Sequence, residues 1–199
     1  LYSALQRLNE VAWNISTAED PVEFNFFGIN QVQMHEDIGL NFAAALRSFL
    51  RQDPDIIMVG EIRDQATADM AVQAALTGHL VFSTLHTNDA PSAITRLLEL
   101  GVPAYLINAT LVGVLAQRLV RTLCPHCKKK VDLPKDALLR LGFLEQDLTQ
   151  PMELYEPAGC PRCNNGYKGR TGLYQVMPVT EEVQRIILAE GTSLDIAAQ

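Results

Sequence analysis

The fold is decided by the stretch Asp55-Ile56-Ile57-Met58-Val59-Gly60-Glu61-Ile62-Arg63-Asp64. Its apolar run is short and bounded by Pro54 and Gly60, which is typical of a strand buried on both faces. In an open parallel sheet, residues that follow such a strand face the ligand crevice at its carboxyl end. A carboxylate there, Glu61, suits a magnesium ion or an attacking water beside a nucleotide. The alternative is a core strand whose flanking charges only mark its exit into solvent, and this stretch alone leaves both interpretations open.

Strands and helices alternate on either side of this stretch. We predict strands over 14–18, 29–34 and 80–85, the last of them buried, and helices over 1–11, 41–52, 64–77, 90–100 and from Pro103 to near Arg121. Asn41, Asp64 and Asp89 are suitable N-caps, because their side chains can accept a hydrogen bond from the first helical turn. The alternation predicts an α/β fold with a mostly parallel sheet.

Polar residues gather next to two of the other predicted strands. Glu19 and Asp20 follow the first strand, and Pro21 ends regular structure directly after them. A turn with solvated charges is the alternative. His79 and His86 bracket the last strand and favour a site there, although a single histidine is usually structural.

Two arginines share one side of the predicted helix over 41–52. Arg47 and Arg51 lie four residues apart, so their side chains project from neighbouring turns. They form either a solvated basic edge or a contact with phosphate or a neighbouring subunit, since a guanidinium group can bind oxyanions through two hydrogen bonds.

The composition bounds the class of protein. The chain has 199 residues, 48% of them hydrophobic, and a net charge of −7, which argues against a surface that coats nucleic acid. The apolar stretch 104–120 contains Asn108, Gln117 and Arg118, so we interpret it as a packed helix and not as a membrane span. The chain begins at Leu1 without a methionine, and we expect it to be a fragment.

All four cysteines lie in two Cys-x-x-Cys pairs, which indicates metal binding more than disulfides. The pairs are Cys124 with Cys127 and Cys160 with Cys163. Four thiolates make a closed tetrahedral zinc site, which is structural because no position stays open for a substrate. The alternative is two pairs of free thiols. The other elements expected in this part are a small helix over 134–144, a polar loop around 150–151, a strand over 173–176, a helix over 180–189 and a last helix from Ser193.

With these stretches assembled, the sequence resembles the type II secretion and type IV pilus assembly ATPases, hexameric motors typified by general secretion pathway protein E. The stretch 18–23 resembles the aspartate box of this family, 50–64 its Walker B region and 77–88 its histidine box. The stretch 116–119 followed by the two cysteine pairs resembles the metal-binding insertion of the assembly and secretion motors, which the pilus retraction motors generally lack.

The resemblance implies a RecA-like, mostly parallel sheet and a set of domains. These are a partial ATPase core over 1–89, a helical region over 90–123, a tetracysteine metal-binding subdomain over 124–168 and a C-terminal strand and helical extension over 169–199. The glycine-rich Walker A loop of the family, Gly-x-x-x-x-Gly-Lys-Ser/Thr, occurs nowhere in the chain. Because that loop normally cradles the phosphates, we expect the isolated fragment to be inactive.

For the intact protein, the resemblance implies hydrolysis of Mg²⁺-bound ATP by in-line attack of water. Glu61 would position that water, and Asp55 would support the magnesium-bearing strand, so that both residues contribute to binding Mg²⁺–ATP. Glu19 and Asp20 would lie near the magnesium ion and its waters.

The resemblance also implies a closed ring, expected to be a homo-hexamer. His79 and His86 would sense or stabilise the nucleotide state. Arg47, Arg51 and Arg63 are candidate arginine fingers, some of them acting across a subunit boundary.

The partners implied are inner-membrane platform proteins of a secretion or pilus machine, with no nucleic acid. The expected location is the cytoplasmic side of the inner membrane of a Gram-negative bacterium, as a peripheral protein. The stretch 111–118 favours the secretion branch slightly, and pilus assembly is the alternative. Two other classes stay open: a RecA-like DNA translocase, which the acidic charge disfavours, and a non-catalytic zinc-bearing interaction module.

Overall fold

The computed structural model describes residues 1–149 and 152–199, so the loop predicted around 150–151 lies outside the described residues. The chain divides into two compact units. We refer to residues 1–116 with 175–199 as the sheet unit and to residues 117–174 as the cysteine unit. No helix in the described part of the chain is both long enough and apolar enough to cross a membrane.

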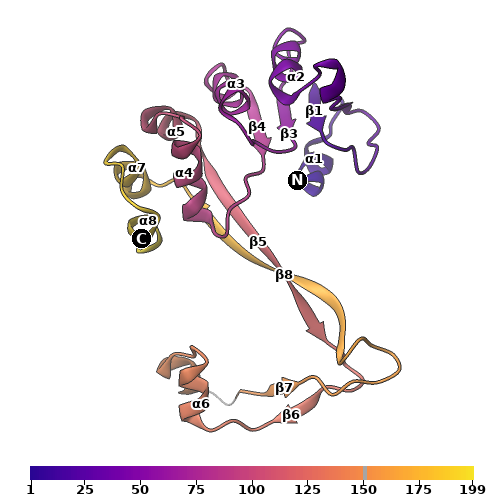
Figure 1. Ribbon diagram of the computed structural model, residues 1–199, viewed down its shortest axis with the longest axis vertical. Helices are drawn as coiled ribbons and strands as arrows, with labels where there is room; N and C mark the ends of the chain where they lie inside the picture. Colours follow the sequence, from indigo (N-terminus) through magenta and orange to yellow (C-terminus); the bar gives the residue numbers. More distant parts are fainter. Residues whose placement is uncertain (150–151) are drawn as a thin grey trace. The chain divides into compact units, whose positions relative to one another are not determined.

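The sheet unit is built on four parallel strands (Figure 1). The strands are β1 (Ile15–Glu19), β2 (Asn30–Gln33), β3 (Ile56–Val59) and β4 (Leu80–Ser83), in the order β2-β1-β3-β4. Every residue of β1 and of β3 is buried, because these are the two inner strands. The parallel α/β fold predicted from the sequence is therefore confirmed.

Helices cover both faces of β3. Its side chains alternate between two clusters, with Ile57 and Val59 on one face and Ile56 and Met58 on the other. The first face packs against α2 (Phe42–Phe49) and the end of α3 (Gln65–Leu76), and the second packs against α1 (Tyr2–Leu8). The predicted caps form as expected: Asn41 accepts from Ala44 N–H at 2.9 Å and Asp64 accepts from Thr67 N–H at 2.8 Å. A short 3₁₀ helix, Glu36–Ile38, precedes α2.

Leu46→Ala in α2 is expected to lower the free energy of unfolding of the sheet unit by about 2–5 kcal/mol. Leu46 is fully buried between Phe42, Phe49 and the first face of the sheet, so its removal leaves a cavity. Urea unfolding measures this loss. Leu76→Ala is the matched control: Leu76 is 52% exposed at the end of α3, and its loss is expected to be only about 0.5 kcal/mol. Equal effects of the two substitutions would contradict this packing.

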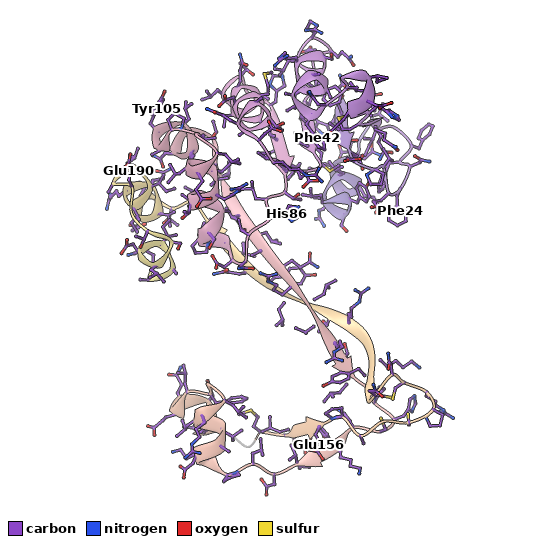
Figure 2. All side chains as sticks on the ribbon, in the orientation of Figure 1. Phe24, Phe42, His86, Tyr105, Glu156 and Glu190 are labelled. Carbon is purple, nitrogen blue, oxygen red and sulfur yellow. The ribbon has the colours of Figure 1, made fainter. Side chains whose placement is uncertain are left out.

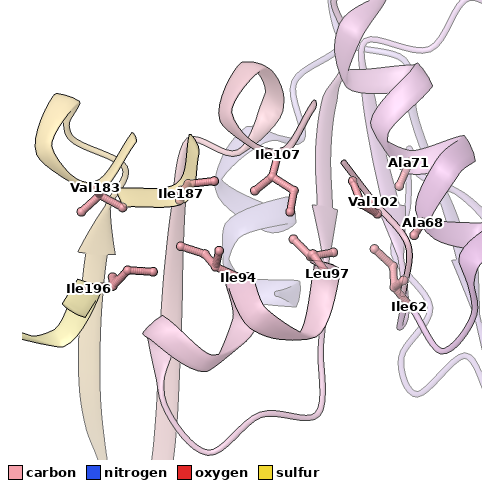
Figure 3. Close-up of a cluster of buried hydrophobic side chains, with 10 residues drawn as sticks. All are labelled: Ile62, Ala68, Ala71, Ile94, Leu97, Val102, Ile107, Val183, Ile187 and Ile196. Atoms are coloured by element: carbon pink, nitrogen blue, oxygen red, sulfur yellow. The ribbon is translucent and has the colours of Figure 1, made fainter. Parts of the chain in front are cut away.

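A further core joins α3 to four helices of the sheet unit (Figure 3). These helices are α4 (Ala90–Glu99), α5 (Ala104–Thr110), α7 (Glu181–Leu188) and α8 (Ser193–Ala197). Ile94, Ile107 and Ile187 are almost completely buried at its centre. The C-terminal helices predicted from the sequence thus form, and they pack against helices from the middle of the chain.

The prediction of a helix that continues to near Arg121 is wrong, because α5 ends at Thr110 and strand β5 (Gly113–Leu123) follows. The region 90–123 is therefore not helical throughout. Strand β5 pairs with β8 (Tyr167–Pro178), and backbone hydrogen bonds at the two ends join Val179 to Val112 and Cys124 to Gly166. The partner strand β8 lies about 50 residues further along the chain, so the local residue pattern of 113–123 does not reveal the pairing.

A second correction concerns β4, which was predicted to be buried. Its four residues are exposed or partly exposed, because β4 is an edge strand with a single strand neighbour, β3. In the cysteine unit, β6 (Lys129–Val131) pairs antiparallel with β7 (Leu154–Glu156). That unit also contains α6 (Lys135–Arg140), at the place of the predicted small helix, and a 3₁₀ helix, Glu145–Thr149.

Candidate functional site

Two carboxylates lie at the carboxyl edge of the parallel sheet. Glu19 ends β1, and Glu61 follows the end of β3. The two strand ends are adjacent, since Ala18 pairs with Val59 and Gly60 N–H donates to Ala18 carbonyl oxygen at 2.8 Å. A Cβ at Gly60 would lie 3.3 Å from that oxygen, so a glycine allows this close approach. This is the edge at which open parallel sheets bind their ligands.

Glu61 is held by two basic side chains. Its carboxylate accepts a hydrogen bond from Arg63 and lies 2.9 Å from His86 Nε2. Its side chain is only 13% exposed, whereas the side chain of His86, which is labelled in Figure 2, is 86% exposed. The hydrogen bond from Arg63 is the main cause that lowers the pKa of Glu61; burial opposes the shift and His86 adds to it. Glu61 is therefore ionised at neutral pH.

The segment after β4 is tied to the segment after β3. Thr84 Oγ1 donates to Gly60 carbonyl oxygen at 2.6 Å, and Ile62 N–H donates to Thr84 carbonyl oxygen at 3.0 Å. These bonds place His86 beside Glu61, as the sequence pattern of polar residues at strand ends suggested.

Glu19 is the more deeply buried of the two carboxylates, with 3% of its surface exposed. It accepts hydrogen bonds from Thr17 Oγ1 at 2.5 Å, from Gln31 Nε2 at 3.0 Å and from the hydroxyl of Tyr2. Sequence reasoning missed these three donors. Thr17 could have been found, because residues two apart on a strand share a face, but Tyr2 and Gln31 come from other elements.

The negative charge of Asp20 acts on the guanidinium group of Arg63. The bond to Glu61 is the main cause that raises the pKa of Arg63, and the negative charges of Asp20 and Glu36 add to it. The structure thus brings five of the predicted site residues to one edge: Glu19, Asp20, Glu61, Arg63 and His86.

Two predicted site residues lie at the opposite edge. Asp55 precedes β3, and its carboxylate accepts a hydrogen bond from Asn14 N–H at 2.7 Å. His79 precedes β4, and its Nδ1 lies 2.8 Å from Ala74 carbonyl oxygen, at the end of α3. A strand of four residues spans about 13 Å, which separates both side chains from Glu61. The two histidines that bracket β4 therefore do not converge.

The two arginines of the basic helix edge are also away from the carboxylates. Arg47 and Arg51 are exposed at the end of α2, in the segment that leads to the amino end of β3. Arg51 Nη2 lies 3.4 Å from Ser48 Oγ. The structure therefore does not bring these two arginines to the carboxyl edge of the sheet.

The four cysteines converge within the cysteine unit. Their Sγ atoms all lie within 4.8 Å of one another, with 4.0 Å between Cys124 and Cys160, 3.7 Å between Cys127 and Cys163, and 3.6 Å between Cys160 and Cys163. A tetrahedral zinc site with bonds of about 2.3 Å needs sulfur separations of about 3.8 Å. The arrangement therefore fits this metal.

The thiol electrostatics differ within the cluster. Burial is the main cause that raises the pKa of Cys127, to about 11. Burial acts in the same direction on Cys163, but hydrogen bonds from the backbone and from Cys160 outweigh it and lower its pKa to about 7. A metal ion would favour the thiolate form at all four positions, because only thiolates are ligands.

A parallel sheet with acidic side chains at its carboxyl edge defines the class of α/β proteins that bind ligands at that edge. The comparison with known families is specific within that class. The sequence model of the type II/IV secretion system protein family matches residues 1–199. The chain belongs to this family.

Curated relatives of the chain include both pilus and secretion proteins. It is 55% identical over 199 residues to the type IV pilus assembly ATPase PilB of Acinetobacter baylyi, covering 100% of this chain and 34% of that protein. It is 56% identical over 198 residues to PilB of Myxococcus xanthus, covering 98% and 35%. It is 50% identical over 191 residues to the type II secretion system ATPase E of Vibrio cholerae, covering 96% and 37%. The chain thus spans about a third of the length of these relatives.

Solved structures agree with this assignment. The pilus retraction motor PilT with bound ADP has a TM-score of 0.65 and 30% identity, over 95% of this chain and 46% of that one. The Legionella pneumophila ATPase DotB has a TM-score of 0.63 and 26% identity, over 98% and 45%.

Proposed function

We propose that this chain is part of a longer motor protein that hydrolyses ATP. It would supply the catalytic residues at the carboxyl edge of the sheet and the four cysteines. The observation that carries the proposal is the meeting of Glu19, Glu61, Arg63 and His86 at the carboxyl edge of a parallel sheet. The names of the relatives, which are ATPases of pilus assembly and type II secretion, agree with it. In this proposal the sheet is the RecA-like core of the motor.

Glu61 is the residue that positions the attacking water. It is ionised, largely shielded from solvent and held in direction by Arg63 and His86, as a general base or water-orienting group must be. Magnesium, when bound with ATP, supplies charge neutralisation at the phosphates. Glu19 and Asp20 would lie near its water shell, as the family resemblance implies. Arg63 stays a candidate for phosphate contact, which would require it to leave Glu61.

The more distant residues receive different roles. Asp55 accepts a hydrogen bond from Asn14 N–H, and His79 contacts the carbonyl oxygen of Ala74 at the end of α3. Both residues would therefore stabilise the positions of the strands and would not contact the nucleotide directly. Arg47 and Arg51 would reach the nucleotide of a neighbouring subunit, which fits a ring and, as the family resemblance implies, a homo-hexamer.

The 199-residue chain alone is expected to bind ATP weakly and to show no measurable hydrolysis. It contains no glycine-rich phosphate loop, which normally supplies most of the contacts with the phosphates. Isothermal titration with Mg²⁺–ATP and a phosphate-release assay measure this, with the full-length protein as the positive control. Turnover by the chain alone would show that the edge described here is sufficient.

Within the family, we propose the pilus assembly branch, with inner-membrane platform proteins as partners and a peripheral location on the cytoplasmic side of the membrane. Sequence identity supports this branch, because it is 55–56% to the two PilB proteins and 50% to the Vibrio cholerae secretion ATPase. This proposal differs from the slight preference for secretion that the stretch 111–118 gave. Deletion of the gene in its host tests this. Loss of pili with intact secretion is expected, and the reverse would assign the secretion branch.

The cysteine cluster is proposed to hold a structural zinc ion. The sulfur separations of 3.6–4.0 Å support this, as does the small apolar core of the unit. In the described part of the cysteine unit, the buried apolar side chains are only Cys124 and Leu138, so a metal ion is needed as an additional source of stability.

A further inference from the structure

The carboxylate of Glu19 is the centre of a hydrogen-bond network that joins three elements of the sheet unit. The donors are the hydroxyl of Tyr2 from α1, Oγ1 of Thr17 from β1 and Nε2 of Gln31 from β2. Tyr2 binds Oε2 of the carboxylate, whereas the other two bind Oε1. Both oxygens are thereby fixed, and because Glu19 is almost fully buried, these donors replace water as its partners.

The same side chains hold the loop that follows β1. Tyr2 Oη accepts a hydrogen bond from Glu23 N–H at 3.1 Å. Gln31 donates to Phe24 carbonyl oxygen at 2.9 Å and accepts from Phe26 N–H at 2.6 Å. The ring of Tyr2 also meets the rings of Phe24 and Phe26 edge-on, with centroids 5.9 and 5.2 Å apart. The ring and the hydroxyl of Tyr2 thus have separate partners.

We propose that Tyr2 is a positioning residue for the reaction: its hydroxyl sets the direction of the Glu19 carboxylate and ties the loop that carries Asp20 to helix α1. This inference rests on the proposed ATPase function. Through this hydroxyl, a displacement of α1 would be passed to Glu19 and to the loop that carries Asp20.

The hydroxyl of Tyr2 is suited to this task because it keeps its proton. Burial is the main cause that raises the pKa of Tyr2, and the neighbouring Glu19 carboxylate raises it further. Tyr2 therefore remains a donor toward Glu19 at neutral pH.

The substitution Tyr2→Phe in the full-length protein tests the hydroxyl alone, because the ring contacts stay and only the hydroxyl is lost. We expect kcat for ATP hydrolysis to fall about 10- to 100-fold, as is usual for a residue that orients a metal-site carboxylate. The KM for ATP should stay the same, and the melting temperature should fall by no more than a few degrees, as expected for the loss of one buried hydrogen bond. Tyr105→Phe, at a tyrosine on α5 that is 63% exposed, is the matched control and should leave kcat unchanged.

Two further measurements decide whether Tyr2 acts through Glu19. In a double-mutant cycle, Tyr2→Phe added to Glu19→Gln should cause no further loss of kcat. In hydrogen exchange, the amide of Glu23 should exchange faster in Tyr2→Phe than in the wild type or in Tyr105→Phe. Multiplied losses in the double mutant, unchanged exchange at Glu23 or unchanged kcat would each overturn the inference. If the wild-type full-length protein had no ATPase activity, both the proposed function and the role of Tyr2 in the reaction would be overturned. Hydrogen exchange at the Glu23 amide would still decide whether the Tyr2 hydroxyl holds the loop.

Discussion

Glu61→Gln in the full-length protein is expected to reduce kcat for ATP hydrolysis by about 10²- to 10⁴-fold, the range for loss of a general acid–base group. The amide has nearly the same shape as the carboxylate, so the packing at the end of β3 is preserved. It cannot accept a proton or carry the negative charge that holds Arg63 and His86 in place. A phosphate-release assay at saturating Mg²⁺–ATP measures the effect.

Glu99→Gln is the matched control for Glu61→Gln. Glu99 also pairs with an arginine, Arg96, at 3.3 Å, but on the exposed surface of α4, where its side chain is 59% exposed. An exposed pair of this kind contributes little, so activity should stay at the wild-type level. Retained hydrolysis in Glu61→Gln, with the oligomeric state verified by light scattering, would remove Glu61 from the reaction.

Replacement of Cys160 and Cys163 by serine is expected to abolish zinc binding and to unfold the cysteine unit. These two thiols supply half of a four-sulfur site, and the few buried apolar side chains of the unit cannot compensate. Metal analysis should give about one zinc ion per wild-type chain and close to none in the variant. Hydrogen exchange should show lost protection in 117–174 and intact protection in the sheet unit.

His126→Ser is the matched control for the cysteine variant. His126 lies inside the first cysteine pair in sequence, but it is exposed and does not belong to the sulfur cluster. Zinc content and protection should therefore remain at wild-type levels. A well-folded wild type with clearly less than one zinc ion per chain would argue against the closed site, and loss of zinc in His126→Ser would show a different ligand set.

Much of the sheet unit could be predicted because its signals are local. A helix N-cap acts over three residues, and Asn41 and Asp64 cap their helices as their positions indicated. A short apolar run between Pro54 and Gly60 is sufficient to define β3. The position of Glu61 at the carboxyl edge follows once the sheet is parallel. The same logic, applied to the direction of the strands, also explains why Asp55 and His79 lie at the other edge.

Other features depend on partners that are far away in the sequence. The segment 113–123 is a strand because β8 binds it, so its own residue pattern was misleading. The surroundings of Glu19 are of the same kind: Tyr2 is 17 residues away and Gln31 is 12 residues away. The sequence predicted that this acid follows a strand, but only the packing of α1 and β2 against β1 determines which donors surround it. Local order depends on neighbours along the chain, whereas the direction of a buried carboxylate depends on every element that reaches it.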